Sequence, residues 1–254
     1  KTQLTQPLAL AIDSTGKIYA ANDSATKVLI FPAGSKGNVK PQVLGGSKVP
    51  LVATEAITLD TSDNIFVSDY RANQVLVFAA GSTGNTAPIR TISGSKTDLT
   101  APGGMAVDAS GDLFVINFTY PSTKSILEFA PGANGNVAPI SYIGGSKTLI
   151  VEPDSVQLDS TGRIICDSNS ALVLIFAKGA SGNVPPAAVI SGPKTHLTGV
   201  TSVGVAPKDD IFVTSASGGS IRVFAPTANG NVPPLRTISG SKTGLHDPFY
   251  PSFY

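Results

Sequence analysis

The sequence is poor in several residue types, and each shortage excludes a class of protein. It has no Trp, one Met, one Cys and two His among 254 residues. The lone Cys166 excludes an internal disulfide framework, and its apolar neighbours Ile164 and Ile165 predict a buried core thiol. Charged residues make up only 14% of the chain, well below the roughly 25% of an average soluble domain.

Charge of one sign does not accumulate along the chain. The 18 Lys and Arg are spread evenly and the net charge is +1. Phosphate binding needs a concentrated basic face, so we expect no nucleic-acid partner. The apolar runs are far shorter than the roughly 20 residues of a spanning helix, so we expect no membrane span. We recognise no leader within this sequence, and a leader that has been removed stays open as an alternative. The low charge and the Ser/Thr/Gly-rich loops favour an extracellular or periplasmic location.

Glycine and proline are plentiful, at 26 and 19 residues, and 41% of the chain is hydrophobic. Many short apolar runs separated by Gly/Pro turns are typical of an all-β protein. Three columns repeat in register about every 48 residues, which indicates tandem copies. They are the Asn of G-x-x-G-N (T-x-x-G-N in the fifth copy), a Phe seven residues earlier, and the Lys of G-S-K or G-P-K. The asparagines are Asn38, Asn85, Asn136, Asn183 and Asn231.

Each copy contains four strand-like runs with the β-branched and aromatic bias of strands. In the first copy three of them are 8–12, 18–21 and 28–31, and in the second the fourth is 89–92. Four antiparallel strands repeated radially predict a β-propeller, which we favour over a β-solenoid. We predict one domain, 1–254, with five blades at about 1–47, 48–95, 96–146, 147–193 and 194–241. An incomplete six-bladed propeller is the alternative.

The third copy carries a family resemblance. Residues 102–115 read P-G-G-M-A-V-D-A-S-G-D-L-F-V, which resembles the NHL-repeat signature. The second copy departs at Gln74, where the family favours Arg, and the fifth has Ala206-Pro207 in place of the turn Asp. The resemblance implies a propeller, related at the level of the fold to lactonase-like and streptogramin-lyase-like propellers. It does not imply one function.

The aromatic-rich segment 242–254 starts in register and then loses the pattern. We favour a C-terminal tail that covers the junction of blades five and one over the start of a sixth blade. The repeated lysines are expected to reach loop carbonyls. The repeated asparagines, on the face opposite the loop that leads into the first strand, are expected to fix a turn by bonding backbone groups.

The candidate ligand-binding residues lie where the copies differ, on the face that carries the loops before the first strand and after the second. They are Asn22, Glu55, Asp69, Asn117, Phe118, Tyr120 and Asp154. The carboxylate and amide groups would make an oxygen-rich ring that suits a hard cation. No cofactor is expected, with Ca²⁺ at this ring as the alternative, and no metal ligand is assigned. Phe118 and Tyr120 belong to the longer loop of the third copy, where exposed aromatics could stack on a ligand.

His196 and His246 each follow a Lys-Thr pair. Streptogramin lyases are also propellers, and a His base there would suit general acid–base work, but we expect two solvated loop histidines. No catalytic residue is assigned. The function we predict is a monomeric, non-catalytic binding or scaffold propeller for a protein, glycan or small ligand. The alternative is a metal-assisted, lactonase-like hydrolase or lyase.

Overall fold

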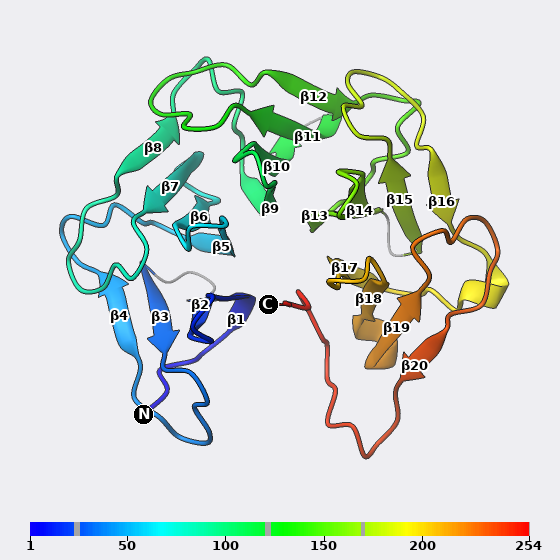
Figure 1. Cartoon of the computed structure of the whole chain (residues 1–254), viewed down its shortest axis with the longest axis horizontal. Coiled ribbons are helices and arrows are strands. Elements are labelled where there is room, and N and C mark those ends of the chain that lie inside the picture. The colour runs from blue at the N-terminus through cyan, green and yellow to red at the C-terminus, as the bar shows by residue number, and fades with distance from the viewer. Residues whose placement is uncertain (23–25, 120–122, 169–170, 254) are drawn as a thin grey trace. The chain divides into compact units, whose positions relative to one another are not determined.

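Figure 1 shows a computed structural model of the chain, which describes residues 1–22, 26–119, 123–168 and 171–253. Within these residues, twenty strands form five four-stranded antiparallel sheets, and in each sheet the strands follow one another in chain order. The all-β class and the five-bladed β-propeller are therefore confirmed. No helix among the described residues is long and apolar enough to cross a membrane.

Each blade corresponds to one copy of the repeat. The strands of blade 1 are β1 (Pro7–Ile12), β2 (Ile18–Asn22), β3 (Lys27–Phe31) and β4 (Gln42–Gly45). Those of blade 2 are β5 (Thr54–Leu59), β6 (Ile65–Asp69), β7 (Gln74–Phe78) and β8 (Arg90–Ser93). Those of blade 3 are β9 (Pro102–Val107), β10 (Leu113–Thr119), β11 (Thr123–Phe129) and β12 (Ser141–Gly144).

Blade 4 contains β13 (Val156–Leu158), β14 (Ile164–Ser168), β15 (Leu172–Phe176) and β16 (Ala188–Ile190). Blade 5 contains β17 (Val200–Val205), β18 (Ile211–Ser215), β19 (Ser220–Phe224) and β20 (Arg236–Ile238). Two short 3₁₀ turns, η1 (Pro193–Thr195) and η2 (Ala216–Gly218), lie in the connections. The strands agree with the sequence prediction to within one or two residues.

The chain divides into two compact units, and each is described by itself. The first contains residues 1–119 and 127–140, which form blades 1 and 2 and most of blade 3. The second contains residues 141–253 with the start of β11, and so holds blades 4 and 5 and the C-terminal segment.

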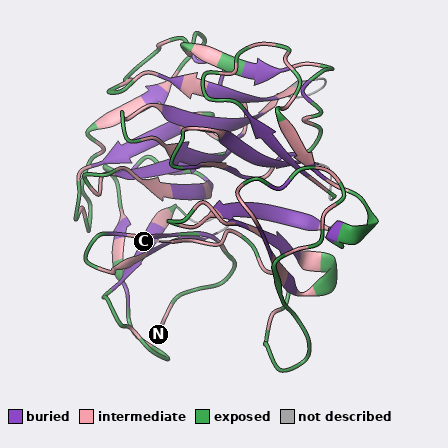
Figure 2. Cartoon of the chain, turned by 45° about the vertical axis from the view of Figure 1, so that its right-hand side comes forward, coloured by how far each residue is buried: buried purple, intermediate pink, exposed green. Residues whose placement is uncertain are grey.

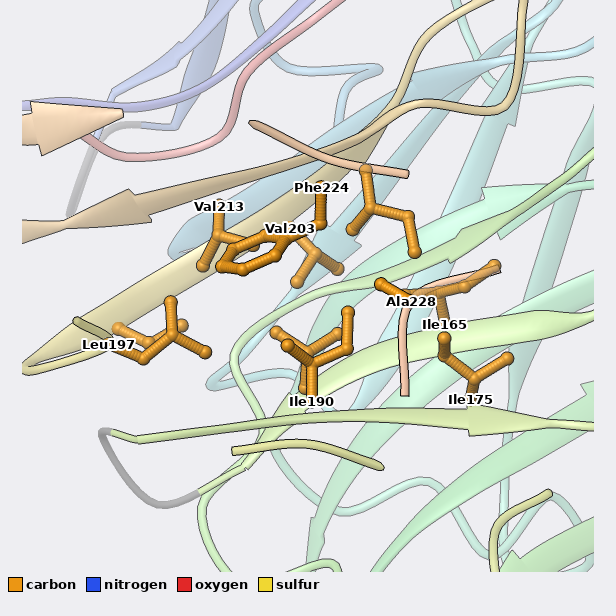
Figure 3. Packing of buried hydrophobic residues seen from close by; sticks show 11 residues of the cluster. Ile165, Ile175, Ile190, Leu197, Val203, Val213, Phe224 and Ala228 are labelled. Atoms are coloured by element: carbon orange, nitrogen blue, oxygen red, sulfur yellow. The ribbon is translucent and has the colours of Figure 1, made fainter. Parts of the chain in front are cut away.

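Each unit has a core made between the faces of neighbouring sheets. In the first, side chains from blades 2 and 3 cluster around Phe66 and Phe129. In the second, the cluster is formed by Ile165, Val173, Ile175, Ile190, Leu197, Val200, Val203, Ile211, Val213, Phe224 and Ala228 (Figure 3). Figure 2 shows many strands buried over much of their length and loops that are mostly exposed, while the fourth strand of blade 5, β20, is exposed throughout. Cys166 is fully buried, as predicted, and burial raises the pKa of its thiol.

The repeated asparagines join blades to one another. In four blade junctions, Asn Oδ1 accepts, at 2.7 Å, the backbone N–H of the repeated lysine that follows the fourth strand of the preceding blade. The pairs are Asn85 with Lys48, Asn136 with Lys96, Asn183 with Lys147, and Asn231 with Lys194. The asparagines do bond backbone groups, as expected, but their place opposite the loop that leads into the first strand was wrongly predicted. The repeated asparagines lie in the long loop between the third and fourth strands, and this loop brings them beside the loop that leads into the first strand.

The glycine before each of these asparagines adds two backbone hydrogen bonds to the junction. In the last one, Gly230 N–H donates to Val189 O at 2.6 Å, and Gly230 O accepts Ser191 N–H at 3.2 Å. Gly192, at φ +106°, makes room for the incoming side chain, because an added Cβ would lie 2.8 Å from Asn231 Oδ1. We call this arrangement of Gly-Asn turn, receiving glycine and lysine N–H the junction lock.

The C-terminal segment lies against blade 5 without forming a regular strand. Thr201 Oγ1 donates to Pro248 O at 2.6 Å, and Tyr250 N–H donates to Ser202 Oγ at 2.6 Å. The Phe253 ring lies 4.8 Å from the Phe212 ring, centroid to centroid. A tail packed on its own unit is thus observed, while its predicted cover of the junction between blades 5 and 1 involves both units and stays a prediction.

Candidate functional site

Residues that end the second strands hold the loops that lead into the first strands. Asp69 is fully buried, and its carboxylate accepts hydrogen bonds from the backbone N–H groups of Val52 at 2.7 Å, Ala53 at 3.0 Å and Ala72 at 3.2 Å. Gln74 Nε2 donates to the same carboxylate at 3.2 Å. Four donors within the chain therefore share the two carboxylate oxygens of Asp69, which the sequence predicted to bind a ligand.

Both candidate asparagines donate from Nδ2 to a backbone carbonyl oxygen. Asn117 is buried, with Oδ1 accepting Thr100 N–H at 2.7 Å and Nδ2 donating to Asp98 O at 2.9 Å. Buried Asn22 donates from Nδ2 to Gln3 O at 3.1 Å. A ligand at Asn117 would have to replace backbone hydrogen bonds, whereas Asn22 Oδ1 is buried without a hydrogen-bond partner among the described residues. The role of both asparagines in binding stays a prediction.

The aromatic candidate Phe118 lies partly buried at the end of β10. Its ring covers Gly103 of β9, where an added Cβ would come within 3.2 Å of Phe118 Cζ. Its centroid is 6.5 Å from that of Tyr70 in an edge-on arrangement. Phe118 thus packs onto the neighbouring strand. Glu55 lies in β5 and is partly buried, and Tyr120 lies outside the described residues.

Asp154 belongs to the second unit and is part of an acidic group. Burial raises the pKa of its carboxyl, and the Glu152 charge adds to that rise, while the Lys124 ammonium opposes it. Its backbone N–H and that of Ser155 donate to the buried Asp167 carboxylate at 3.0 and 2.8 Å. Desolvation, with the Asp154 charge added, raises the pKa of Asp167 to about 7. Among the described residues no group of three or more His, Cys, Asp or Glu is placed to hold a metal ion.

A surface cavity of about 520 Å³ lies within the second unit, between blades 4 and 5. It is lined by Ala171, Gly192, Pro193, His196, Leu197, Thr198 and Arg222. Ala171 follows the second strand of blade 4, and the segment 192–198 leads into the first strand of blade 5. These are the two kinds of loop that the sequence analysis placed on the functional face. His196 is exposed, as expected for a loop histidine.

Arg222 is the charged residue of this cavity. Its Nη1 donates to Ser220 Oγ at 2.6 Å and to Ser215 Oγ at 3.2 Å. Its Nε is buried without a hydrogen-bond partner among the described residues. Burial lowers the pKa of the guanidinium, and no carboxylate of the described chain pairs with it. The side chain therefore holds a partly desolvated positive charge that no carboxylate among the described residues neutralises.

The position of Arg222 within the repeat makes this charge unusual. Two residues before the repeated Phe, the other four blades have buried leucines at exposures between 0% and 4%. They are Leu29, Leu76, Leu127 and Leu174. Blade 5 alone replaces this core leucine by arginine. Arg222 was not among the predicted site residues, because those residues lie at the strand ends, where the copies differ most visibly. The sequence signal for Arg222 was the position two residues before the repeated Phe, within the third strand, where the other four copies have leucine.

Comparison with known proteins supports the fold. No protein-family model matches the sequence, and no curated protein matches it significantly. Solved propellers match the structure at low sequence identity. A streptogramin B lyase matches with TM-score 0.56 and 13% identity, over 88% of this chain and 66% of the lyase chain, so this chain spans about two thirds of that length.

Two further structures show similar agreement. A catalytically inactive His-to-Ala variant of virginiamycin B lyase from Staphylococcus aureus, with quinupristin, matches with TM-score 0.62 and 12% identity over 100% of this chain and 76% of its own. The WD40 β-propeller domain of Doa1 matches with TM-score 0.61 and 12% identity over 91% of this chain and 68% of its own. These similarities relate the chain to lyase and WD40 propellers in fold alone.

Proposed function

We propose that this chain is a non-catalytic binding propeller that takes a ligand with an anionic group at the Arg222 cavity on its loop face. The observation that carries the proposal is the arginine at a position where four blades bury leucine. A partly buried charge without a counter-ion among the described residues costs free energy, and proteins keep such groups where function uses them.

The chemistry of the cavity favours a carboxylate, sulfate or phosphate group on a small ligand or glycan. A guanidinium presents several N–H donors in a plane and binds such groups strongly in a partly desolvated site. The volume of about 520 Å³ lies within the range of small-molecule sites. Leu197 lines the cavity and also belongs to the core of blades 4 and 5, which supplies an apolar wall for the rest of the ligand.

The test is a calorimetric titration with glucuronate and with glucose at constant ionic strength, on wild type and on Arg222→Leu. Arg222→Leu restores the residue of the other four blades, so the fold should tolerate it. Arg71→Gln, at an exposed loop position, is the matched control. We expect glucuronate alone to bind to wild type and to Arg71→Gln, and not to Arg222→Leu. Equal heats with all three proteins would refute the proposal.

A lyase-like or hydrolase-like activity is the second candidate, because His196 lines the same cavity as Arg222. A neutral imidazole could accept a proton while the guanidinium stabilises negative charge that forms on a substrate. Elemental analysis of the purified protein and its melting temperature with added Ca²⁺ test whether such an activity is metal-assisted. A stoichiometric divalent ion, lost in Asp154→Ala, would favour it, and no metal with no Ca²⁺-dependent shift would contradict it.

A further inference from the structure

The wall of the Arg222 cavity departs from the repeat at a second position. Most of the lining residues lie in the segment 192–198, which leads into β17. This segment begins Gly-Pro-Lys, with Pro193 directly after the receiving glycine of the junction lock. The other occurrences of the motif have serine at this position, namely Ser47, Ser95, Ser146 and Ser241. Two residues that are each unique in their repeated column, Pro193 and Arg222, therefore line the same cavity.

Proline changes the local structure of this wall. Pro193 begins the 3₁₀ turn η1, and its ring fixes φ at about −65°, which suits the first position of a helix. Its carbonyl accepts His196 N–H at 3.4 Å, a hydrogen bond without an equivalent at the four serines among the described residues. Thr195 donates from N–H and Oγ1 to Gly192 O at 3.0 and 2.6 Å, and Leu197 N–H donates to Thr195 Oγ1 at 3.2 Å. The chain's own hydrogen bonds thus fix the backbone of the wall.

The proline also gives up a contact that serine makes elsewhere. At the first junction lock, Asn85 Nδ2 donates to Ser47 Oγ at 3.1 Å, in addition to the bond that Asn85 accepts from Lys48 N–H. Pro193 has no hydroxyl group, so Asn231 Nδ2 cannot bond in this way. The proline is therefore better explained by the cavity that it lines than by the junction lock.

A flexible wall would make ligand binding weaker. Pro193, His196 and Thr198 are exposed, and an exposed loop that becomes ordered only when a ligand arrives loses conformational entropy at that moment. Proline removes part of this freedom before binding, because it restricts its own φ and the conformation of the residue before it. That residue is Gly192, and glycine has the most backbone freedom of any residue type.

We propose that Pro193 is a positioning residue of the ligand site, which holds the segment 192–198 in its binding conformation before the anionic ligand arrives. Arg222 then binds the anionic group, and the preformed wall contacts the rest of the ligand. The role of Pro193 rests on the proposed function of the Arg222 cavity. Because the contacts to the ligand do not involve the proline ring in this role, serine at this position should weaken binding through entropy.

The experiment compares Pro193→Ser with Pro207→Ser by calorimetric titration with glucuronate. Serine is the residue at the four equivalent positions, so Pro193→Ser should fold. Pro207 is the matched control, because it is exposed in the turn between β17 and β18, at the end of β17 away from the cavity. We expect Pro193→Ser to bind about two- to fivefold more weakly with the binding enthalpy unchanged. Pro207→Ser should bind as wild type does, although both variants should melt at a slightly lower temperature.

Hydrogen exchange of the backbone N–H groups of Thr195, His196 and Leu197 gives a readout that a purely structural residue would not move. In wild type these groups should be protected equally before and after glucuronate is added. In Pro193→Ser their protection should be about two- to fivefold lower without glucuronate, and it should reach the wild-type level at saturation. Pro193→Ala should behave in the same way, because the effect comes from the loss of the ring and not from a new hydroxyl group.

The outcomes separate the role of Pro193 from the function on which it rests. If wild type did not bind glucuronate, the proposed function would fail, and the role of Pro193 with it. If wild type bound glucuronate and Pro193→Ser bound it equally well, the positioning role alone would be overturned. An affinity loss that Pro207→Ser shared equally, or one carried by the binding enthalpy, would also overturn the positioning role.

Discussion

Arg222→Leu should stabilise the protein while it abolishes anion binding. The leucines at the equivalent position of the other blades are almost fully buried, and fully burying a leucine contributes about 1.5–3 kcal/mol. The variant also removes a buried Nε that has no hydrogen-bond partner among the described residues, and such an atom costs about 1–3 kcal/mol. Both terms favour leucine.

Two effects reduce this gain. Arg222 already buries part of its aliphatic stem, because the side chain is partly buried. Its Nη1 bonds to Ser215 and Ser220, and leaving these buried hydroxyls without it costs about 1 kcal/mol each. The net expectation is a free energy of unfolding about 1–2 kcal/mol higher. That corresponds to a melting temperature about 2–8 °C higher for a chain of this size.

Urea unfolding at constant pH, followed by fluorescence and circular dichroism, measures this difference. The reverse substitution in blade 4, Leu174→Arg, is the control, and it should destabilise by about 3 kcal/mol or more because it buries an unpaired charge. If Arg222→Leu instead destabilised the protein by more than 1 kcal/mol, as a role in structure alone would predict, the arginine would be a structural residue. The main argument for a ligand at this cavity would then fail.

Three further results are expected. The pKa of Asp167 in the folded protein is about 7, above its usual 3.8, so the folded state holds this proton more tightly than the unfolded state. The free energy of unfolding should therefore fall as pH rises from about 4 to about 7. In Asp167→Asn this pH dependence of the unfolding free energy should disappear, and an unchanged pH dependence would contradict the raised pKa of Asp167. Tyr250→Phe removes the hydrogen bond from Tyr250 Oη to Asp154 O at 2.8 Å, so calorimetry should show a loss of about 1 kcal/mol, and no loss would mean that the C-terminal segment is not held there. His196→Ala should leave glucuronate binding unchanged in the binding proposal, and a lost affinity measured by titration would assign His196 to the ligand.

The fold could be predicted from the sequence because each copy repeats the same local chemistry. A column of phenylalanines and a column of Gly-Asn pairs in register require one supersecondary unit per copy, and one unit per copy leads to a propeller. The buried Cys166 followed from its apolar neighbours for the same local reason.

The site was less predictable because its contacts are not local. The carboxylate of Asp69 was offered to a ligand, but it accepts hydrogen bonds from backbone groups 16 and 17 residues earlier. The hydrogen-bond partner of a polar side chain at a strand end depends on the path of the loop that packs against it. No repeated position in the sequence reports that path. Arg222 was visible in the sequence as a difference within a strand. Its meaning depended on knowing that the four equivalent leucines are buried.

The junction lock also sets an order for building the protein on the ribosome. Each receiving lysine obtains its asparagine only after a further 36 to 40 residues have been synthesised. The outer strand edge of a newly made blade therefore stays unpaired until most of the next blade has left the exit tunnel. The nascent chain exposes one such edge at a time, and that edge moves along the growing polypeptide until translation stops.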